Sequence, residues 1–261
     1  MEYVVISITA LFVSVLALFS GFGLGTVLMP AFALFFPISV AIAATAVVHL
    51  ANNIFKIILV GRDADWKVVY RFALTAALAA IAGAWLLGWL SWMPAIASYQ
   101  IGGQLFELTL VKLVIGILII GFALFDLIPK LQKLAFDRKY LPFGGILSGF
   151  FGGLSGNQGA MRSAFLIKSG LDTNAFVGTN AVCAFIVDIV RLVVYSATFY
   201  TANFTHIGND VWMLVLAATV FAFIGSFVGS RLVKKITIHT VQYVVGVMLV
   251  TVGIGLSTGL I

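Results

Sequence analysis

Two glycine-rich stretches determine how this chain can cross a membrane. Residues 21–25 read Gly-Phe-Gly-Leu-Gly and interrupt an apolar segment, 4–36, which at 33 residues is too long for a single crossing. Residues 152–159 read Gly-Gly-Leu-Ser-Gly-Asn-Gln-Gly and interrupt a second apolar segment, 141–168. Because glycine permits turns that other residues resist, the two stretches predict two helices that break inside the membrane.

The composition around these breaks is that of an integral membrane protein. Of 261 residues, 62% are hydrophobic and 9% are charged, whereas a soluble domain is roughly half apolar and a quarter charged. A single cysteine, Cys183, leaves no disulfide framework and no Cys-based zinc cage. The net charge of +6 is explained by loops facing anionic lipid, so we expect no nucleic-acid partner. Six more segments have spanning length: 38–60, 67–91, 107–126, 172–200, 208–230 and 236–260.

The two halves of the chain resemble each other. An offset of 134 residues places Thr45 on Thr179 and the first glycine break on residues 155–160 of the second. We therefore predict an all-α polytopic fold made of two repeats in one membrane domain, residues 1–130 and 131–261. Each repeat would contain a broken, re-entrant helical hairpin followed by three transmembrane helices. Paired broken helices in two halves of a chain are typical of secondary transporters.

The basic residues predict the orientation. If each broken segment returns to the side it came from, each half crosses three times and the repeats are inverted. Eleven of the 15 basic residues then lie on one face, and the opposite loops, 92–106 and 201–207, contain none. We expect the basic face to be cytoplasmic and both termini to lie outside. The alternative is that each broken segment is a long, tilted, kinked span. The eleven are Arg62, Lys67, Arg71, Lys130, Lys133, Arg138, Lys139, Lys168, Arg231, Lys234 and Lys235.

The breaks themselves predict an anion site. A chain that turns inside the hydrocarbon leaves backbone N–H groups unpaired, so a protein-lined or watery cavity must cover them. Each returning arm begins near Thr26 or Ala160, and its positive N-terminal end would point at the membrane centre. The alternative is that the glycines only permit close helix packing.

Polar side chains inside the apolar segments complete the candidate site, because such residues are costly in a membrane and commonly functional. Residues 45, 49, 52 and 56 form one helical stripe, and residues 180, 184, 188 and 191 form another. Asp188 and Arg191 are spaced to form a structural ion pair. The predicted substrate-binding residues are Gly23, Gly25, Thr26, Thr45, His49, Asn53, Lys56, Asn157, Gln158, Gly159, Arg162, Thr179, Asn180 and Arg191.

Several of these residues have a second interpretation. Lys56 lies four residues from the end of its segment, so its ammonium group could reach the membrane surface instead of a ligand. Arg162 lies three residues past the second break, beside the predicted anion site, but could also extend to the headgroups. His49 could be a hydrogen-bonded core residue, and Arg191 could serve packing once Asp188 neutralises it.

The chain lacks the sequence signs of an enzyme. No pair of catalytic aspartates, no serine nucleophile with a base and no H-E-x-x-H motif occurs. His206 and His239 fall near loops on opposite faces, so they do not form a cluster with His49. We predict that the protein is not an enzyme and that it uses no metal and no cofactor.

The order of these motifs resembles the sulfite exporter TauE/SafE family. The resemblance rests on the first glycine break leading to Pro30, on the Ala43-Ala44-Thr45 run, on residues 61–66 (Gly-Arg-Asp-Ala-Asp-Trp) and on the glycines of 144–153. It extends over essentially the whole chain and implies transport of sulfite and small organosulfur anions. The second copy departs from the first, since Ala164 stands where the first copy has Pro30.

These observations predict a secondary transporter of sulfite or a related small organosulfur oxyanion in the cytoplasmic membrane, working by alternating access. Export needs no coupling ion, because the negative cytosol drives an anion outward by about 2.3 kcal/mol per charge per 100 mV. An anion channel, or an importer of another small anion, is the alternative, and an intramembrane enzyme is a weaker one. The expected partners are the anion and the lipid bilayer. Whether the chain forms a homodimer is left open.

Overall fold

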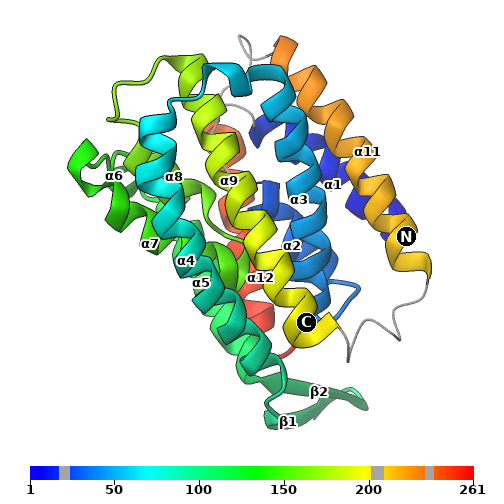
Figure 1. The fold of residues 1–261 in the computed structure, drawn as a ribbon. Coiled ribbons are helices and arrows are strands. Elements are labelled where there is room, and N and C mark those ends of the chain that lie inside the picture. Colours follow the sequence, from blue (N-terminus) through cyan, green and yellow to red (C-terminus); the bar gives the residue numbers. More distant parts are fainter. Residues whose placement is uncertain (18–23, 201–208, 233–237) are drawn as a thin grey trace.

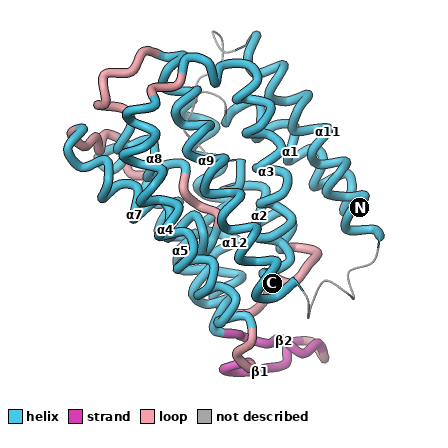
Figure 2. Tube along the Cα trace, viewed as in Figure 1, coloured by secondary structure: helices cyan, strands magenta, loops and turns pink. Residues whose placement is uncertain are grey.

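The protein is a bundle of helices with one small β-hairpin at one end (Figures 1 and 2). The computed structural model describes residues 1–17, 24–200, 209–232 and 238–261. The first half contains α1 (Glu2–Ala17), α2 (Leu24–Ala33), α3 (Ile38–Val60), the short turn η1 (Gly61–Asp63), α4 (Trp66–Ser91), β1 (Ala95–Ile101), β2 (Gln104–Thr109) and α5 (Leu110–Leu127). The second contains α6 (Pro129–Gln132), η2 (Arg138–Tyr140), α7 (Leu141–Ser155), α8 (Gly159–Leu166), α9 (Thr173–Tyr195), the π-helical turn η3 (Ser196–Tyr200), α11 (Asn209–Leu232) and α12 (Ile238–Thr258).

The apolar helices agree with the prediction of a polytopic membrane protein. Within the described residues, four helices are long and apolar enough to span a membrane: 38–63, 66–91, 173–198 and 211–229. Four shorter apolar helices accompany them: 2–15, 24–33, 110–125 and 245–258. The helical class of the fold is therefore confirmed.

Helix α4 shows why this bundle suits a lipid environment. Its small residues Ala76, Ala80 and Ala84 are buried, whereas the large apolar residues Leu78 and Trp85 on its other face are exposed. A soluble helix would bury its large residues and expose polar ones. Large apolar side chains are stable in contact with lipid. The small residues can therefore face the neighbouring helices and allow the helix backbones to approach closely.

The region between α4 and α5 differs from the sequence prediction. Residues 92–106 are predicted as a loop and 107–126 as a helical segment, but β1 and β2 pair as an antiparallel hairpin and α5 begins only at Leu110. Gly102 and Gly103 both adopt positive φ, 60° and 84°. A Gly-Gly pair between two short strands favours a two-residue hairpin turn. This pair is the sequence signal that distinguishes the hairpin from a loop.

Each of the most extensive helix contacts joins the two halves of the chain. Helix α4 packs on α7, α1 on α11, α5 on α12, and α3 on α9. Residues 1–130 and 131–261 therefore do not form separate bodies, and the interior lies between them.

Glycine carries the α4–α7 contact. A Cβ added at Gly149 would collide with the backbone of Ala76, and one at Gly153 would collide with the carbonyl oxygen of Ala80. Glycine at these positions is thus required by the distance between the two helix backbones, not by a turn.

The second broken segment folds back on itself. The N–H of Phe136, just before α7, donates to the carbonyl of Ala164 near the end of α8 at 3.0 Å. The rings of Phe136 and Phe165 stack with centroids 4.3 Å apart. The end of α8 therefore lies beside the start of α7. Residues 18–23, where the first segment breaks, lie outside the described residues.

The connecting segments gather at two opposite ends of the bundle (Figure 1). At one end, the N–H of Asp65 donates to Thr179 Oγ1 at 2.9 Å, and Arg138 lies 3.5 Å from Asp65. At the other end, the Tyr99 hydroxyl of the hairpin donates to the carbonyl of Thr258 near the C-terminus at 2.5 Å. Segments 61–71 and 130–139 therefore meet at the first end, and the last turn of α8, which precedes Lys168, lies beside Phe136 of the second segment.

Candidate functional site

The break between α7 and α8 lies in the bundle interior. Helix α7 ends at Ser155 and is capped by Gly156, whose φ of 78° is left-handed, and α8 begins at Gly159. Asn157 and Gln158 are almost wholly buried. Neither polar atom of the Asn157 side chain, nor Oε1 of Gln158, has a hydrogen-bond partner among the described residues. Unpaired amide groups at a break in a membrane helix mark a place for a polar ligand or water.

A buried carboxylate faces this break. Asp188 on α9 lies with Oδ2 2.6 Å from His49 Nδ1 and 2.8 Å from Asn53 Nδ2, both on α3. Its Oδ1 lies 2.7 Å from Arg191 Nη2, and Gln158 Nε2 donates to it at 3.5 Å. One carboxylate thus joins α3, α9 and the break. The structure places Asp188 and Arg191 in contact, as their spacing predicts.

Arg191 also touches the backbone of α7. Its Nη1 donates to the carbonyl of Gly152 at 3.3 Å, and one turn further along α9 the Tyr195 hydroxyl donates to the carbonyl of Gly153. These bonds tie the last turn of α7 to α9. The Gly152 carbonyl also accepts the N–H of Gly156 at 3.0 Å, so it takes two hydrogen bonds, whereas the bond from Tyr195 satisfies the Gly153 carbonyl in the last turn of α7.

Arg162 lies on α8, one turn past the break. Its Nε donates to Oδ1 of Asn180 on α9 at 2.6 Å, while its Nη1 is buried without a partner among the described residues. Asn180 carries no charge, so the guanidinium of Arg162 keeps its full positive charge. A planar guanidinium with a free donor next to unpaired amides is suited to the oxygens of an oxyanion.

Of the first break, the structure describes the end that leads into α2. Gly25, at the start of α2, lies so close to the second break that a Cβ there would be 3.1 Å from the carbonyl oxygen of Gly156. The same Cβ would be 3.7 Å from the methyl group of Thr45, whose hydroxyl is buried without a partner among the described residues. Thr26 is buried beside them. The two broken segments therefore meet, although Gly23 lies outside the described residues.

Thr179 lies elsewhere. Its hydroxyl accepts the N–H of Asp65, so it secures the η1 connection at the end of the bundle rather than the contact between the two breaks. Gly178 beside it packs against the backbone of Val60. The structure thus brings predicted site residues of α3, α8 and α9 together, while the hydroxyl of Thr179 bonds to the connection after η1.

The buried charges of the site do not cancel. Lys56, Arg162 and Arg191 are 7%, 3% and 0% exposed, and Asp188 is 0% exposed. Asp188 is the one buried carboxylate among the residues whose side chains the structure describes. Over those side chains, and with His49 neutral, three buried cations stand against one carboxylate, which leaves an excess of two positive charges. Since burying unpaired charge is costly, the excess favours binding of an anion.

Some polar contacts of the interior were missed by the sequence analysis. Asn52 accepts a hydrogen bond from Ser226 on α11 at 2.6 Å, and Gln158 Nε2 donates to Asp188 at 3.5 Å. The position of Tyr195, seven residues after Asp188 on the same face of α9, is a helical-period signal that could have assigned it to the site.

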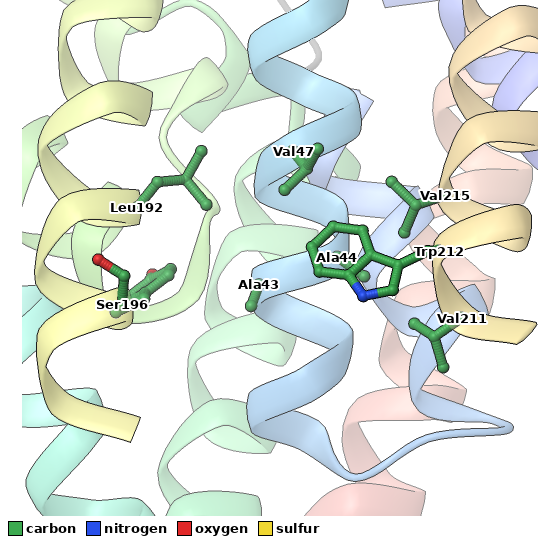
Figure 3. Close-up of a pocket in the computed structure, with 9 residues that line it drawn as sticks. Ala43, Ala44, Val47, Leu192, Ser196, Val211, Trp212 and Val215 are labelled. Carbon is green, nitrogen blue, oxygen red and sulfur yellow. The ribbon is translucent and has the colours of Figure 1, made fainter. Parts of the chain in front are cut away.

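A separate apolar pocket of about 140 Å³ lies between α3, α9 and α11 (Figure 3). Figure 3 shows Ala43, Ala44 and Val47 of α3 between Leu192 of α9 and Trp212 of α11. Residues 43 and 47 lie on a different face of α3 from the stripe that carries Thr45 and His49. Tyr195, which bonds to the Gly153 carbonyl, also lines the pocket, so the pocket adjoins the charged site on its α9 side.

No metal centre competes with this interpretation in the described part of the chain, where no group of three or more His, Cys, Asp or Glu side chains could hold an ion. The fold and the site together define a multi-pass helical membrane protein with a charged interior built at a helix break. The family model of the sulfite exporter TauE/SafE family matches residues 6–256. The chain belongs to that family, whose members are membrane transporters of sulfite and related sulfur anions and not enzymes. No curated protein and no solved structure matches the chain.

Proposed function

We propose that this protein is a secondary transporter that moves sulfite or a related small organosulfur oxyanion across the cytoplasmic membrane, with export as the downhill direction. The observation that carries the proposal is the excess of two buried positive charges beside unpaired amide groups at the α7–α8 break. An anion in that place neutralises the charge and accepts the free hydrogen bonds. Membership of the TauE/SafE family supports a sulfur anion as the substrate.

The binding site in this proposal lies where the two broken segments meet. Arg162 and the amides of Asn157 and Gln158 contact the oxyanion, the buried hydroxyl of Thr45 adds a donor, and Asp188 holds Arg191 and His49 in place. Gly25, Gly159 and the start of α8 let backbone N–H groups approach the anion. Asn53, Asn180 and Lys56 line the same interior.

The proposed mechanism is alternating access between two inverted repeats, 1–130 and 131–261. The helix contacts between the halves support it. Helix α1 of the first half packs on α11, which follows α9. In the same way, α7 of the second half packs on α4, which follows α3. A two-fold relation between the halves produces this exchange of partners. The fold-back of α8 along α7 supports a re-entrant second segment.

A ligand screen tests the function. The purified protein is heated in detergent with sulfite, sulfate, thiosulfate, taurine, sulfoacetate and simple carboxylates, and its unfolding temperature is recorded. Sulfur oxyanions should raise it, because a ligand that binds the folded state stabilises that state. Stabilisation by neutral or cationic solutes alone would contradict the proposal. Saturable flux with counterflow in loaded vesicles would distinguish a carrier from a channel.

We propose further that the end of the bundle with segments 61–71, 130–139 and 168 faces the cytosol and that both termini lie outside. Lys168→Cys in a Cys183→Ala background provides a single exposed thiol at that end. Labelling only by a membrane-permeant reagent in intact cells is expected. Labelling by an impermeant reagent from outside would restore a topology in which each broken segment crosses once.

A further inference from the structure

Lys56 is a buried cation outside the ion pairs of the described residues. It lies on α3, one turn beyond Asn52 and Asn53, and is 7% exposed. The burial of this side chain argues against the alternative that it extends to the membrane surface.

The other charges show what Lys56 lacks. Arg191 is matched by Asp188 at 2.7 Å. Arg162 is matched by no carboxylate among the described residues and donates to the neutral Asn180. Lys56 follows Asn53 by one turn on α3, and Asn53 donates to Asp188 of α9 at 2.8 Å. Helix α3 packs on α9, whose Asn180 also accepts from Arg162. Two positive charges in one low-dielectric region, Arg162 and Lys56, therefore remain for a ligand to neutralise.

We propose that Lys56 makes the site selective for doubly charged anions over singly charged anions of the same size and shape. This inference rests on the proposed anion-binding function and adds the charge of the substrate to it. A single negative charge neutralises Arg162 and leaves Lys56 buried without a counter-charge. A second negative charge on the same ligand removes that penalty. Lys56 is then a specificity-determining residue, and Arg162 is the residue that supplies the primary contact.

Sulfate and methanesulfonate form a suitable pair of probes. Both are tetrahedral at sulfur and similar in size, but one oxygen of sulfate is replaced by a methyl group, so the charge falls from two to one. Water holds the dianion more strongly, so hydration alone would favour methanesulfonate binding. A preference for sulfate therefore reports on the protein's charges. Affinities are measured by calorimetry at one fixed ionic strength, because salt screens such interactions.

The experiment compares three proteins. The wild-type protein should bind sulfate at least about ten-fold more tightly than methanesulfonate, the factor that corresponds to one hydrogen-bonded charge. Lys56→Met should lose roughly 10- to 100-fold in sulfate affinity and little in methanesulfonate affinity. Lys56→Arg should retain the preference because it retains the charge. Lys112→Met is the matched control, since that lysine bonds to the Glu107 carbonyl at the hairpin end.

The outcomes separate the two proposals. If neither anion binds to the folded wild-type protein and sulfite does not bind either, the proposed function fails. If anions bind but the wild-type protein shows no preference for sulfate, the inference about Lys56 is wrong while the function stands. It is equally wrong if a folded Lys56→Met protein keeps the wild-type ratio of affinities.

Discussion

The contact between α4 and α7 consists of small apolar residues, whereas the contact between α3 and α9 contains buried polar side chains. In the first, Gly149 and Gly153 face Ala76 and Ala80, and the helix backbones nearly touch. In the second, His49 and Asn53 of α3 face Asp188 of α9, so polar side chains surround a buried carboxylate. In a membrane no hydrophobic driving force brings apolar helix faces together, so helices associate through close packing or through polar contacts. The comparison indicates that the first contact holds the bundle together and the second creates the site.

The largest effect is expected from breaking the packed contact. Gly149→Leu places a side chain where the backbone of Ala76 already lies, and the two helices must separate. Overpacking typically costs 1–3 kcal/mol, and we expect more than about 3 kcal/mol here because backbone and not a flexible side chain is displaced. The measurement is the yield of monodisperse protein in detergent. Gly121→Leu is the control, because nothing lies within 4 Å of a Cβ at Gly121.

The next effect comes from breaking the polar contact. Asp188→Asn leaves Arg191 buried beside a neutral side chain, and removing one partner of a buried ion pair costs about 3–5 kcal/mol. The unfolding temperature in detergent should fall clearly. The double variant Asp188→Asn/Arg191→Gln should recover part of the loss, since the unpaired charge is gone. Asp137→Asn, at an exposed position, should change nothing; an equally small effect of Asp188→Asn would show that Arg191 is not held by that carboxylate.

The two contacts were not equally predictable from the sequence. The stripe of 45, 49, 52 and 56 on one segment and the pairing of 188 with 191 follow from helical periodicity alone. The contact of His49 with Asp188 does not, because 139 residues separate them and periodicity carries no information about which helices meet. The glycines of α7 are visible in the sequence, but their partner helix is not.

The hairpin and Thr179 illustrate the same limit. Short strands between two membrane helices give weak alternation, and only the turn glycines distinguish them from a loop. Thr179 matches Thr45 in the sequence offset, yet its hydroxyl caps a connection at the bundle end. Similarity between the two repeats predicts that matching residues occupy matching positions on their helices. It does not predict that their side chains contact the same kinds of residue.

A third variant sharpens the comparison by separating function from stability. Arg162→Ala should weaken binding of a sulfur oxyanion by about 1.5–3 kcal/mol, the range for a hydrogen bond to a charged group. The ligand-free protein should not be destabilised, because the variant removes a buried charge that lacks a counter-charge. Calorimetry gives the first quantity and thermal unfolding the second. If Arg162→Ala binds normally while Arg191→Ala or Lys56→Ala abolishes binding, the substrate contacts the α3 side of the interior instead.

The smallest effect is expected where the two contacts meet, at Gly156. This residue ends α7 with a φ of 78°, and a Cβ there would lie 2.8 Å from Arg191 Nη1. Gly156→Ala should therefore cost about 1–2 kcal/mol for the left-handed backbone and displace the guanidinium of Arg191 as well. Gly170→Ala is the matched control, since Gly170 has nearly the same φ, 77°, with nothing within 4 Å of its Cβ. Thermal unfolding should show the backbone strain in both variants and an additional loss in Gly156→Ala, and anion affinity should fall only in Gly156→Ala. Equal behaviour of the two variants in both measurements would mean that Gly156 serves the turn alone and that the packed and polar contacts are independent of each other at this point.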